Sequence, residues 1–429
     1  MNILDRLALL PFAVIFVLYP LAAKFILSAA GRRWRIALFA ALNVFFALAL
    51  IIAQTAEGAP LDSSGFLLFL RACVLIFLIY LAFVLANFAV LRKCARGSDD
   101  QAWIAFLFPL VFLCLVKYWP ESIDPLSGLL VGLGNKHRAA FFVGISYMAF
   151  RLSHLLREVQ NGASPQPTLA EYLAFAFYIP TLTLGPINAY SNMQRSLAGE
   201  TNMSGMAGRA WLRILVGLTK YLFLATLLNQ LTYGGLLLDG HPHVPMDLLI
   251  AIPAYTLYLY CNFSGFCDMV IGVSSLLGVE VSENFDRPFS ARNLQEFWNC
   301  WHITLSSWFR DMMFTPLLKV LIRIFGPKST NQMVALTIFT VFVVLGVWHG
   351  VGLNYLIFGL LQGVGLVTVH YYRLFLKKSL SREALAAYLK HRGIRFAGLA
   401  CTFGYFSLTL FFFANSMEDM RSIANAIVS

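Results

Sequence analysis

Charge is what this chain of 429 residues has least of. Only 12% of its residues are Lys, Arg, Asp or Glu, whereas 59% are hydrophobic. Soluble domains carry roughly 25% charged residues. The composition therefore excludes a soluble globular protein and predicts an integral membrane protein.

Cysteine is also rare, and its spacing excludes two kinds of site. The seven cysteines are scattered, no two form a C-x-x-C pair, and most lie in apolar stretches. A disulfide framework uses an even, regularly spaced set, and a zinc site needs closely spaced ligands. We expect buried, unbridged cysteines and no metal site.

Two further absences bear on the class of protein. No internal repeat is visible, which argues against a transporter built from inverted repeats without excluding one. No G-x-S-x-G sequence occurs, which disfavours a Ser-His-Asp hydrolase.

The chain does contain a series of long apolar windows. A helix needs about 20 apolar residues to cross a hydrocarbon core of about 30 Å. About eleven windows qualify, and they lie near 7–30, 36–53, 66–91, 102–118, 139–153, 171–190, 211–232, 247–278, 333–348, 353–372 and 396–414. The first has the length of a retained span and lacks the features of a signal peptide.

No soluble domain of useful size fits between these windows. We therefore predict one all-α polytopic membrane domain over residues 1–429. Its parts are N-terminal helices in 1–100, a core in 101–373 and a C-terminal loop and helix in 374–429.

Basic residues alternate with acidic residues from loop to loop. The formal net charge of +11 comes largely from short basic loops, such as GRRWR at 31–35, RKCAR at 92–96 and the segment 373–395. The intervening loops 54–65 and 119–125 contain acidic residues and no Lys or Arg. By the positive-inside rule, the N-terminus is extracytoplasmic and the basic loops are cytoplasmic, in a multi-pass protein of the cell membrane. Orientation explains the charge, so no nucleic-acid partner is expected.

The polar region 279–332 separates two very apolar blocks and is predicted to be re-entrant. It contains EFWNCWHITLSSWFRD at 296–311. On a helical wheel its large apolar side chains fall within about 120° of one another, which predicts a single amphipathic helix that starts at an Asn293 cap. Such a helix lies in the membrane interface or lines a wet cavity. His302 falls at the edge of the apolar stripe, and from this helix alone a structural histidine is the favoured interpretation.

A second Trp-His pair occurs at 348–349, inside the apolar run 340–363. Ionisable groups at such depth are rare and usually face a cavity or pathway. Gly346, Gly350 and Gly352 allow the helix to break and another backbone to approach. A neutral imidazole at this place can take a proton from a hydroxyl, so His349 is a candidate general base, with a packing histidine as the alternative.

These motifs together resemble a known family. The run from FSGFCDM through NFDRPF, EFWNCWH and WFRD at 263–314 is followed, 47 residues after His302, by GVWHG. Further similarity lies upstream, in FFVGISYMAFRLSHLLREVQNG at 141–162 and EYLAFAFYIPTLTLGPINAYSNM at 171–193. The order of these motifs resembles the core of the membrane-bound O-acyltransferase (MBOAT) family over about residues 100–373.

Within that family, the sequence resembles the bacterial branch that acylates polymers outside the cell. This branch includes the D-alanyl transfer protein of teichoic-acid D-alanylation and the alginate O-acetylases. Acetylases usually carry Gly-Gly-x-Arg after W-F-R-D, whereas this chain continues MMFTPLLKVLIRIFGPKS, and GISYMAFR also looks more like the D-alanyl branch.

The resemblance implies a ring of about 11 transmembrane helices around a tunnel, with His302 and His349 at its narrow middle. It also implies no tightly bound cofactor. An acyl thioester, on a phosphopantetheine carrier protein or on CoA, arrives from the cytoplasm, and the hydroxyl acceptor, with an accessory acyltransferase or an acceptor polymer, lies outside. In the D-alanyl branch the segment after W-F-R-D helps to dock the carrier, which makes Phe314, Leu317, Leu318 and Leu321 the candidate contacts.

The resulting hypothesis is transfer of a short acyl group from a thioester to a hydroxyl. His349 is the favoured base, and His302 positions a substrate or relays the proton. Supporting roles in the tunnel are expected for Trp298, Trp301, Trp348, Asn293, Arg310 and Asp311. Arg310 and Asp311 are expected to pair with each other or with neighbouring loops, and Asp268 to make a polar contact between helices. A transporter or flippase gated by the two histidines and a non-catalytic scaffold remain as alternatives.

Overall fold

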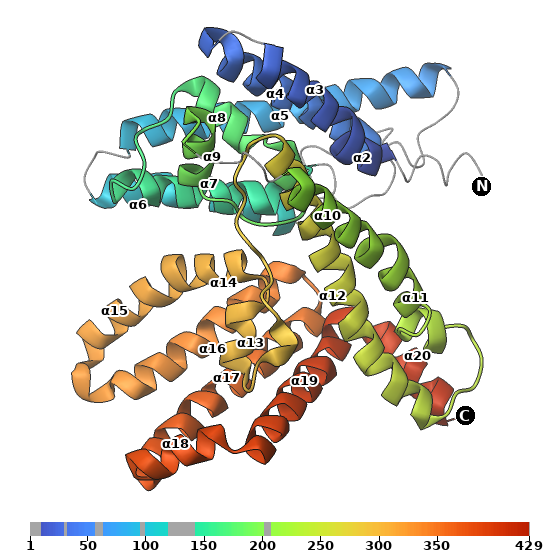
Figure 1. Ribbon diagram of the computed structural model, residues 1–429, viewed down its shortest axis with the longest axis vertical. Coiled ribbons are helices and arrows are strands. Elements are labelled where there is room, and N and C mark those ends of the chain that lie inside the picture. The colour runs from blue at the N-terminus through green and yellow to red at the C-terminus, as the bar shows by residue number, and fades with distance from the viewer. Residues whose placement is uncertain are drawn as a thin grey trace. The chain divides into compact units, whose positions relative to one another are not determined.

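The computed structural model describes residues 10–29, 32–55, 63–94, 99–118, 142–200 and 207–428 (Figure 1). All regular elements in these residues are helices, and the only β-type pairing among them is an isolated bridge between Phe285 and Trp301. The predicted all-α class is confirmed. The chain forms two compact units: the first comprises Met1–Leu215 with Cys267–Ser282, and the second comprises Val216–Phe266 with Glu283–Ser429.

The helices follow one another along the chain with short connections. The elements of the N-terminal half are α2 (Leu10–Ala13), η1 (Val14–Leu18), α3 (Tyr19–Ala29), α4 (Arg32–Thr55), α5 (Ser63–Cys94), α6 (Asp99–Tyr118), α7 (Ile145–Gln160), α8 (Leu169–Ala176), η4 (Ile179–Thr181) and α9 (Tyr190–Ala198). Those of the middle are α10 (Ala207–Leu218), η5 (Thr219–Leu224), α11 (Ala225–Asn229), η6 (Tyr233–Leu237) and α12 (Pro245–Leu276).

The C-terminal part contains the region that carries both Trp-His pairs. Its elements are η7 (Pro288–Ser290), α13 (Leu294–Cys300), α14 (Ile303–Phe309), η8 (Arg310–Phe314), α15 (Thr315–Phe325), η9 (Pro327–Ser329), α16 (Thr330–His349), α17 (Leu353–Ser379), α18 (Arg382–Lys390), α19 (Arg392–Ala414) and α20 (Met417–Val428).

Eight helical stretches of the described chain are long and apolar enough to cross a membrane. They are Pro11–Ser28, Trp34–Thr55, Phe66–Cys94, Ala207–Leu237, Pro245–Leu276, Pro327–His349, Leu353–Ser379 and Arg392–Ala414. Ala102–Tyr118 is apolar but shorter. The protein is thus a multi-pass membrane protein. Of the loops used to predict its orientation, 119–125 lies outside the described residues, and 31–35, 54–65 and 92–96 are described only in part.

Two of the predicted spanning windows, 139–153 and 171–190, form shorter helices instead. In the first, α7 begins after Gly144, whose φ of 69° lies in the left-handed region, and is 16 residues long. In the second, α8 has only eight residues, because it begins at a Thr168 capping box and the chain turns at Pro180. Apolar composition predicts both windows as spans, but these local start and stop signals set the helix lengths.

A buried cation ties α7 to the end of α8. Arg151 is only 1% exposed and donates from Nη1 to Thr181 Oγ1 (2.9 Å) and from Nη2 to Ala176 O (3.0 Å). Ala176 is the last residue of α8, and a positive charge is favourable at the carbonyl end of a helix. Arg151 thus holds α7, the end of α8 and the turn after it together.

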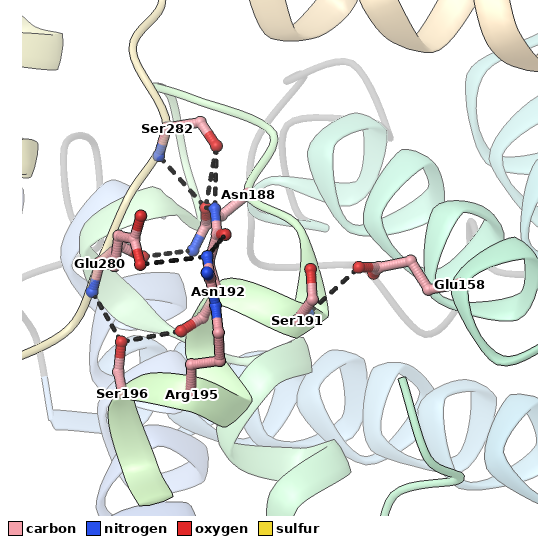
Figure 2. A network of polar contacts seen from close by, with 8 residues as sticks. All are labelled: Glu158, Asn188, Ser191, Asn192, Arg195, Ser196, Glu280 and Ser282. Carbon is pink, nitrogen blue, oxygen red and sulfur yellow. Dashed lines mark hydrogen bonds and ion pairs between the residues drawn. The ribbon is translucent and has the colours of Figure 1, made fainter. Parts of the chain in front are cut away.

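A network of polar contacts anchors the segment that follows α12 to helix α9 (Figure 2). Asn188, which is 2% exposed, donates from Nδ2 to Glu280 O (2.9 Å) and accepts from Ser282 N (3.2 Å). Glu280 N donates to Ser196 Oγ (2.9 Å). We call this set the 279–282 anchor. It gives the non-helical segment backbone partners shortly before the chain reaches the Trp-His region.

The two helices that lead to and from the second Trp-His pair are packed closely. α16 and α17 lie side by side (Figure 1). A Cβ atom on Gly346 would lie 2.5 Å from Tyr355 O and 2.8 Å from Gly359 Cα, so the two backbones nearly touch. Small residues allow such an approach between membrane helices.

Within the second unit, the C-terminal helix α20 packs against η6 and the first half of α12. Ile423 is buried with Tyr233, Leu237 and Ala251. His243 N donates to Ala426 O (2.7 Å), which places the loop between η6 and α12 beside α20. The His243 imidazole lies between Asp239 (2.9 Å) and Asp247 (3.3 Å), so this loop histidine has structural partners.

Candidate functional site

The first Trp-His pair does not lie in one continuous helix. The predicted amphipathic helix is divided into α13 and α14, with His302 between them in a left-handed conformation (φ 46°, ψ 51°). Asp286 N donates to Cys300 O (3.0 Å), and Ile303 N donates to Asn284 O (2.9 Å). These bonds to the extended segment take the backbone out of the helix. The prediction of a single helix was therefore wrong, because periodicity does not report long-range pairing of the backbone.

The predicted helix start at Asn293 is confirmed. Asn293 Oδ1 accepts a hydrogen bond from Glu296 N (3.0 Å) at the beginning of α13. The Glu296 carboxylate accepts from Arg292 N (3.0 Å), whereas a complete capping box would use the N-cap residue itself. Asn293 thus has a structural role at a helix terminus, and Arg373 Nη2 also donates to its Oδ1 (3.2 Å).

The His302 imidazole is enclosed by protein. It is 6% exposed, the Phe263 ring meets it edge to face at 4.7 Å between centroids, and its Nδ1 lies 3.1 Å from Asn284 Oδ1. Burial, together with the nearby imidazole of His349, lowers the pKa of His302 to about 3. The imidazole is therefore neutral at physiological pH.

His349 is the last residue of α16 and is partly buried. Three aromatic rings surround its imidazole, with centroids at 4.7 Å for Trp348, 4.9 Å for Phe413 and 6.1 Å for Phe358. The predicted glycine break is confirmed, because α16 ends here and α17 begins at Leu353. The break also places His349 at a helix end and not within a continuous span.

The turn after His349 packs closely against side chains at the start of α17. A Cβ atom on Gly350 would overlap the Tyr355 ring, and one on Gly352 would overlap the Asn354 side chain. Glycine lets the backbone lie against both side chains without displacing them. The turn therefore fixes the place where α16 ends and, with it, the position of the imidazole.

The tryptophans of the first pair form a buried aromatic wall. Trp298 and Trp301 are 8% and 5% exposed, and Trp301 stacks on Phe297 at 5.4 Å. Trp298 Nε1 donates to Gln362 Oε1 (3.0 Å), and Gln362 Nε2 donates to Thr409 Oγ1 (2.6 Å). This chain of bonds joins α13, α17 and α19 around the first Trp-His pair.

Sequence reasoning missed two residues near these histidines. Gln362 is fully buried on α17, and an amide inside a membrane span is a signal that could have identified it. Asn284 is also fully buried. Its contact with His302 depends on the fold, and no local pattern indicates it.

The charged residues predicted to support the site make local pairs. Arg310 Nε and Asp311 Oδ1 are 3.0 Å apart, with both side chains more than half exposed, which confirms the predicted pair. Arg213 Nε and Asp268 Oδ1 are 3.1 Å apart between α10 and α12, as expected for a contact between helices.

The helix predicted to dock a carrier is α15, with Phe314 just before it. Phe314, Leu317, Leu318 and Leu321 are partly buried. The exposed apolar side chains of this helix are Val320, Ile324 and Phe325, at 52%, 66% and 57%. Lys319 and Arg323 are exposed beside them.

Among the described residues, no group of three or more His, Cys, Asp or Glu side chains is placed to hold a metal ion. The chemistry available at the two Trp-His pairs is that of two imidazoles in an aromatic, largely buried environment. Such groups can accept and donate protons while the walls limit access of water.

Comparison with known proteins identifies the family of this chain. The model of the MBOAT, membrane-bound O-acyltransferase family matches residues 63–412. The chain is 30% identical over 342 residues to the teichoic acid D-alanyltransferase of Streptococcus thermophilus, covering 76% of this chain and 79% of that protein. It is 27% identical over 362 residues to the teichoic acid D-alanyltransferase of Bacillus subtilis, covering 82% and 85%.

A second group of relatives is acetylases. The chain is 27% identical over 279 residues to the probable alginate O-acetylase AlgI of Pseudomonas aeruginosa, covering 63% of this chain and 52% of that protein. The family match spans most of the described helices and both Trp-His pairs. The protein is therefore an acyltransferase that belongs to the membrane-bound O-acyltransferase family.

Proposed function

We propose that this protein transfers a short acyl group, D-alanyl or acetyl, from a cytoplasmic thioester to a hydroxyl of an extracytoplasmic envelope polymer. The relatives named for teichoic acid D-alanylation cover more of the chain than the alginate O-acetylase does, which favours D-alanyl. The observation that carries the proposal is the pair of imidazoles, His302 and His349, which interact electrostatically within one unit.

In the proposed reaction, the acceptor hydroxyl gives its proton to a neutral imidazole as its oxygen attacks the thioester carbonyl carbon. The new ester bond forms, the carbon–sulfur bond breaks, and the thiolate leaves and takes up a proton. His349 is the proposed base, because its partly buried side chain is the more accessible of the two. His302 positions a substrate or relays the proton.

The aromatic walls supply the second requirement of this reaction. A thioester is already activated, so the protein has to align the two reactants and exclude water. Trp298, Trp301 and Trp348, which lie beside the two imidazoles along the chain, are proposed to line the passage in which the acyl group is protected from hydrolysis.

We also propose that an acyl carrier protein supplies the thioester and docks at α15. The proposed docking surface includes the four predicted contacts, which are partly buried: Phe314, Leu317, Leu318 and Leu321. It also includes the exposed apolar side chains of Val320, Ile324 and Phe325. Lys319 and Arg323 would pair with an acidic carrier. Ile324→Ser should weaken binding of a phosphopantetheinylated carrier, whereas Ala386→Ser on exposed α18 should not.

The test of the function replaces His349. His349→Ala, reconstituted in proteoliposomes, should lose at least about 100-fold of the transfer of label from an acyl thioester to a hydroxyl acceptor. His241→Ala, in an exposed loop, is the matched control and should retain activity. Unchanged ester formation in His349→Ala would overturn the role as base. Movement of free solute with no ester product would favour a transporter.

A donor experiment separates D-alanyl from acetyl transfer. The same vesicles are given a D-alanylated carrier protein or acetyl-CoA, each labelled in the acyl group. We expect label to be transferred from the carrier. Transfer from acetyl-CoA alone would instead favour an exopolysaccharide acetylase resembling the alginate O-acetylases.

A further inference from the structure

The amide of Asn284 has an unusual set of partners. The residue is fully buried, and its Oδ1 lies 2.8 Å from Thr304 Oγ1, 3.2 Å from Thr304 N and 3.1 Å from His302 Nδ1. All three contacts are made to the start of α14, on the far side of the bridge between Phe285 and Trp301. A single side-chain oxygen therefore contacts three polar atoms of the turn that carries His302.

The identity of that oxygen follows from its backbone partner. The Thr304 N–H is an obligatory donor, so the atom facing it has to be an acceptor. In an asparagine side chain, only the carbonyl oxygen can accept. The orientation of the amide is thus determined by a group that cannot change its role, and His302 Nδ1 faces an acceptor.

A nitrogen that faces an acceptor at 3.1 Å has to carry the proton. A neutral imidazole has one N–H and one nitrogen with a lone pair, and a hydrogen bond from one nitrogen determines the role of the other. With Nδ1 as the N–H, the lone pair of His302 is on Nε2. We infer that Asn284 is a positioning residue that holds His302 in the Nδ1–H tautomer, so that Nε2 is the ring atom presented to the reacting groups.

This inference rests on the proposed function, in which His302 positions a substrate or relays a proton. With Nε2 unprotonated, His302 can accept a hydrogen bond from the acceptor hydroxyl or take its proton, and it cannot donate from that atom. This narrows the role of His302 to hydrogen-bond or proton acceptor in the first step.

The backbone at His302 supports a positioning role. A residue with a side chain costs roughly 1–2 kcal/mol in the left-handed conformation. His302 adopts it with φ 46° because Ile303 N, bound to Asn284 O at 2.9 Å, ties the next residue to the same asparagine. Strain of this kind persists where surrounding contacts over-determine it. Asn284 thus holds the backbone and the imidazole together.

The direct test measures the tautomer. The full-length protein is labelled with ¹⁵N-histidine, reconstituted in liposomes and studied by solid-state NMR, in which protonated and unprotonated ring nitrogens have distinct shifts. The His302 signals are those lost in His302→Gln. We expect Nδ1 protonated and Nε2 unprotonated at pH 7. A protonated Nε2 in the wild-type protein would overturn the inference, and this result needs no variant of Asn284 to fold.

Asn284→Leu is the second arm, because leucine has a similar volume and no acceptor. We expect signals from both tautomers of His302. The matched control is Asn43→Leu, since Asn43 is also fully buried and its Oδ1 accepts from a side chain, Tyr19 (2.9 Å), and from a backbone N–H, Ile179 (3.3 Å). The control should leave the His302 signals unchanged. Unchanged signals in Asn284→Leu would also overturn the inference.

Kinetics then connect the tautomer to the reaction. Asn284→Leu should lower kcat about 10- to 100-fold with KM changed less than about threefold, by analogy with the loss when the hydrogen-bond partner of a metal-binding histidine is removed. In a His302→Gln background it should cause no further loss. A fully additive loss would contradict action through His302. If His302→Gln alone retains activity, the proposed role of His302 fails, while the tautomer measurement still decides what Asn284 does.

Discussion

Two residues other than glycine have left-handed backbones in the described part of the chain, and they delimit one excursion. Arg287 (φ 48°) precedes η7, and His302 (φ 46°) follows Trp301. Between these turns the chain forms η7 and α13 and then pairs again with residues 284–286, through Cys300 O and Ile303 N. Arg287 is exposed, whereas His302 is buried. The buried residue with a strained backbone is therefore also a candidate residue of the functional site.

Burial of His302 predicts how stability depends on pH. Its pKa is lowered to about 3 in the folded protein, whereas an unfolded histidine titrates near 6.5. Below pH 6.5 the unfolded chain binds a proton that the folded protein does not bind, so stability is lost as pH falls from about 6.5 towards 3. The loss is at most about 1.4 kcal/mol per pH unit.

The measurement compares apparent melting temperatures of wild type and His302→Gln in detergent between pH 7.5 and 5. The wild-type melting temperature should fall more steeply below pH 6.5, because the variant lacks this proton linkage. Parallel curves would show that His302 is not held neutral by the fold. The remaining histidines are common to both proteins and cancel in the comparison.

At the scale of elements, the crossing of α16 and α17 sets the position of His349. Gly346→Ala should destabilise the protein by about 1–3 kcal/mol, because the added methyl forces the two backbones apart. His349 lies three residues further along α16, so acyl transfer should fall as well. Melting temperature and transfer activity are measured together.

Gly404→Ala is the matched control for this crossing. Gly404 lies in α19, and a Cβ atom there would meet no other atom within 4 Å. Alanine favours a helix over glycine by about 0.8–1 kcal/mol, so this variant should be as stable as wild type or more stable. Equal loss of stability in both variants would contradict the role given to the crossing.

The 279–282 anchor is a second element with a testable role. Asn188→Ala removes the three hydrogen bonds that this buried amide makes to Glu280 O, Ser282 N and Ser282 Oγ of the non-helical segment (Figure 2). Backbone amides of 279–282 should then exchange faster with deuterium, because their local opening costs less. Peptide-level exchange by mass spectrometry measures this.

Arg195→Ala tests the exposed part of the same anchor. The Arg195 Nη2 to Glu280 Oε2 pair is 3.3 Å long, with side chains 52% and 44% exposed, and exposed pairs contribute about 0–1 kcal/mol. Exchange in 279–282 should stay close to wild type. Faster exchange in Arg195→Ala than in Asn188→Ala would show that the surface pair, and not the buried amide, holds the segment.

At the scale of the whole molecule, the helices predict which loops share a side of the membrane. α19 is long and apolar enough to cross the membrane once, which predicts that α18 and α20 lie on opposite sides. The loop bearing His241 lies beside α20, because His243 N donates to Ala426 O. The basic residues of 373–395 predict that α18 is cytoplasmic. The loop with His241 and the C-terminal helix are then extracytoplasmic.

Accessibility of single cysteines to an impermeant maleimide tests this orientation. His241→Cys should be labelled in intact cells, and Ala386→Cys on exposed α18 should be labelled only after the membrane is opened. Each variant is compared with a parent in which the exposed Cys114 and Cys401 are replaced by serine. The reverse labelling pattern would contradict the predicted topology. It would also contradict the proposal that the thioester donor binds from the cytoplasmic side.

Composition and motif order were sufficient for the class of protein and for its family. Scarce charge and repeated apolar windows predict membrane helices because lipid excludes unpaired polar groups along the whole span. Hydropathy predicts spans at 139–153 and 171–190, because it does not detect a left-handed glycine or a capping box. The two Trp-His pairs were identified from their residue types alone.

By itself, the sequence determined an all-α membrane protein with two candidate histidines and an Asn293 helix start, because hydropathy, spacing and capping act over a few residues. Only the tertiary structure decided that His302 lies at a left-handed turn and that Asn284 faces its Nδ1. It also decided that Gln362 bonds Trp298. These contacts join residues 18 and 64 positions apart, and no local pattern specifies which buried amide meets which ring.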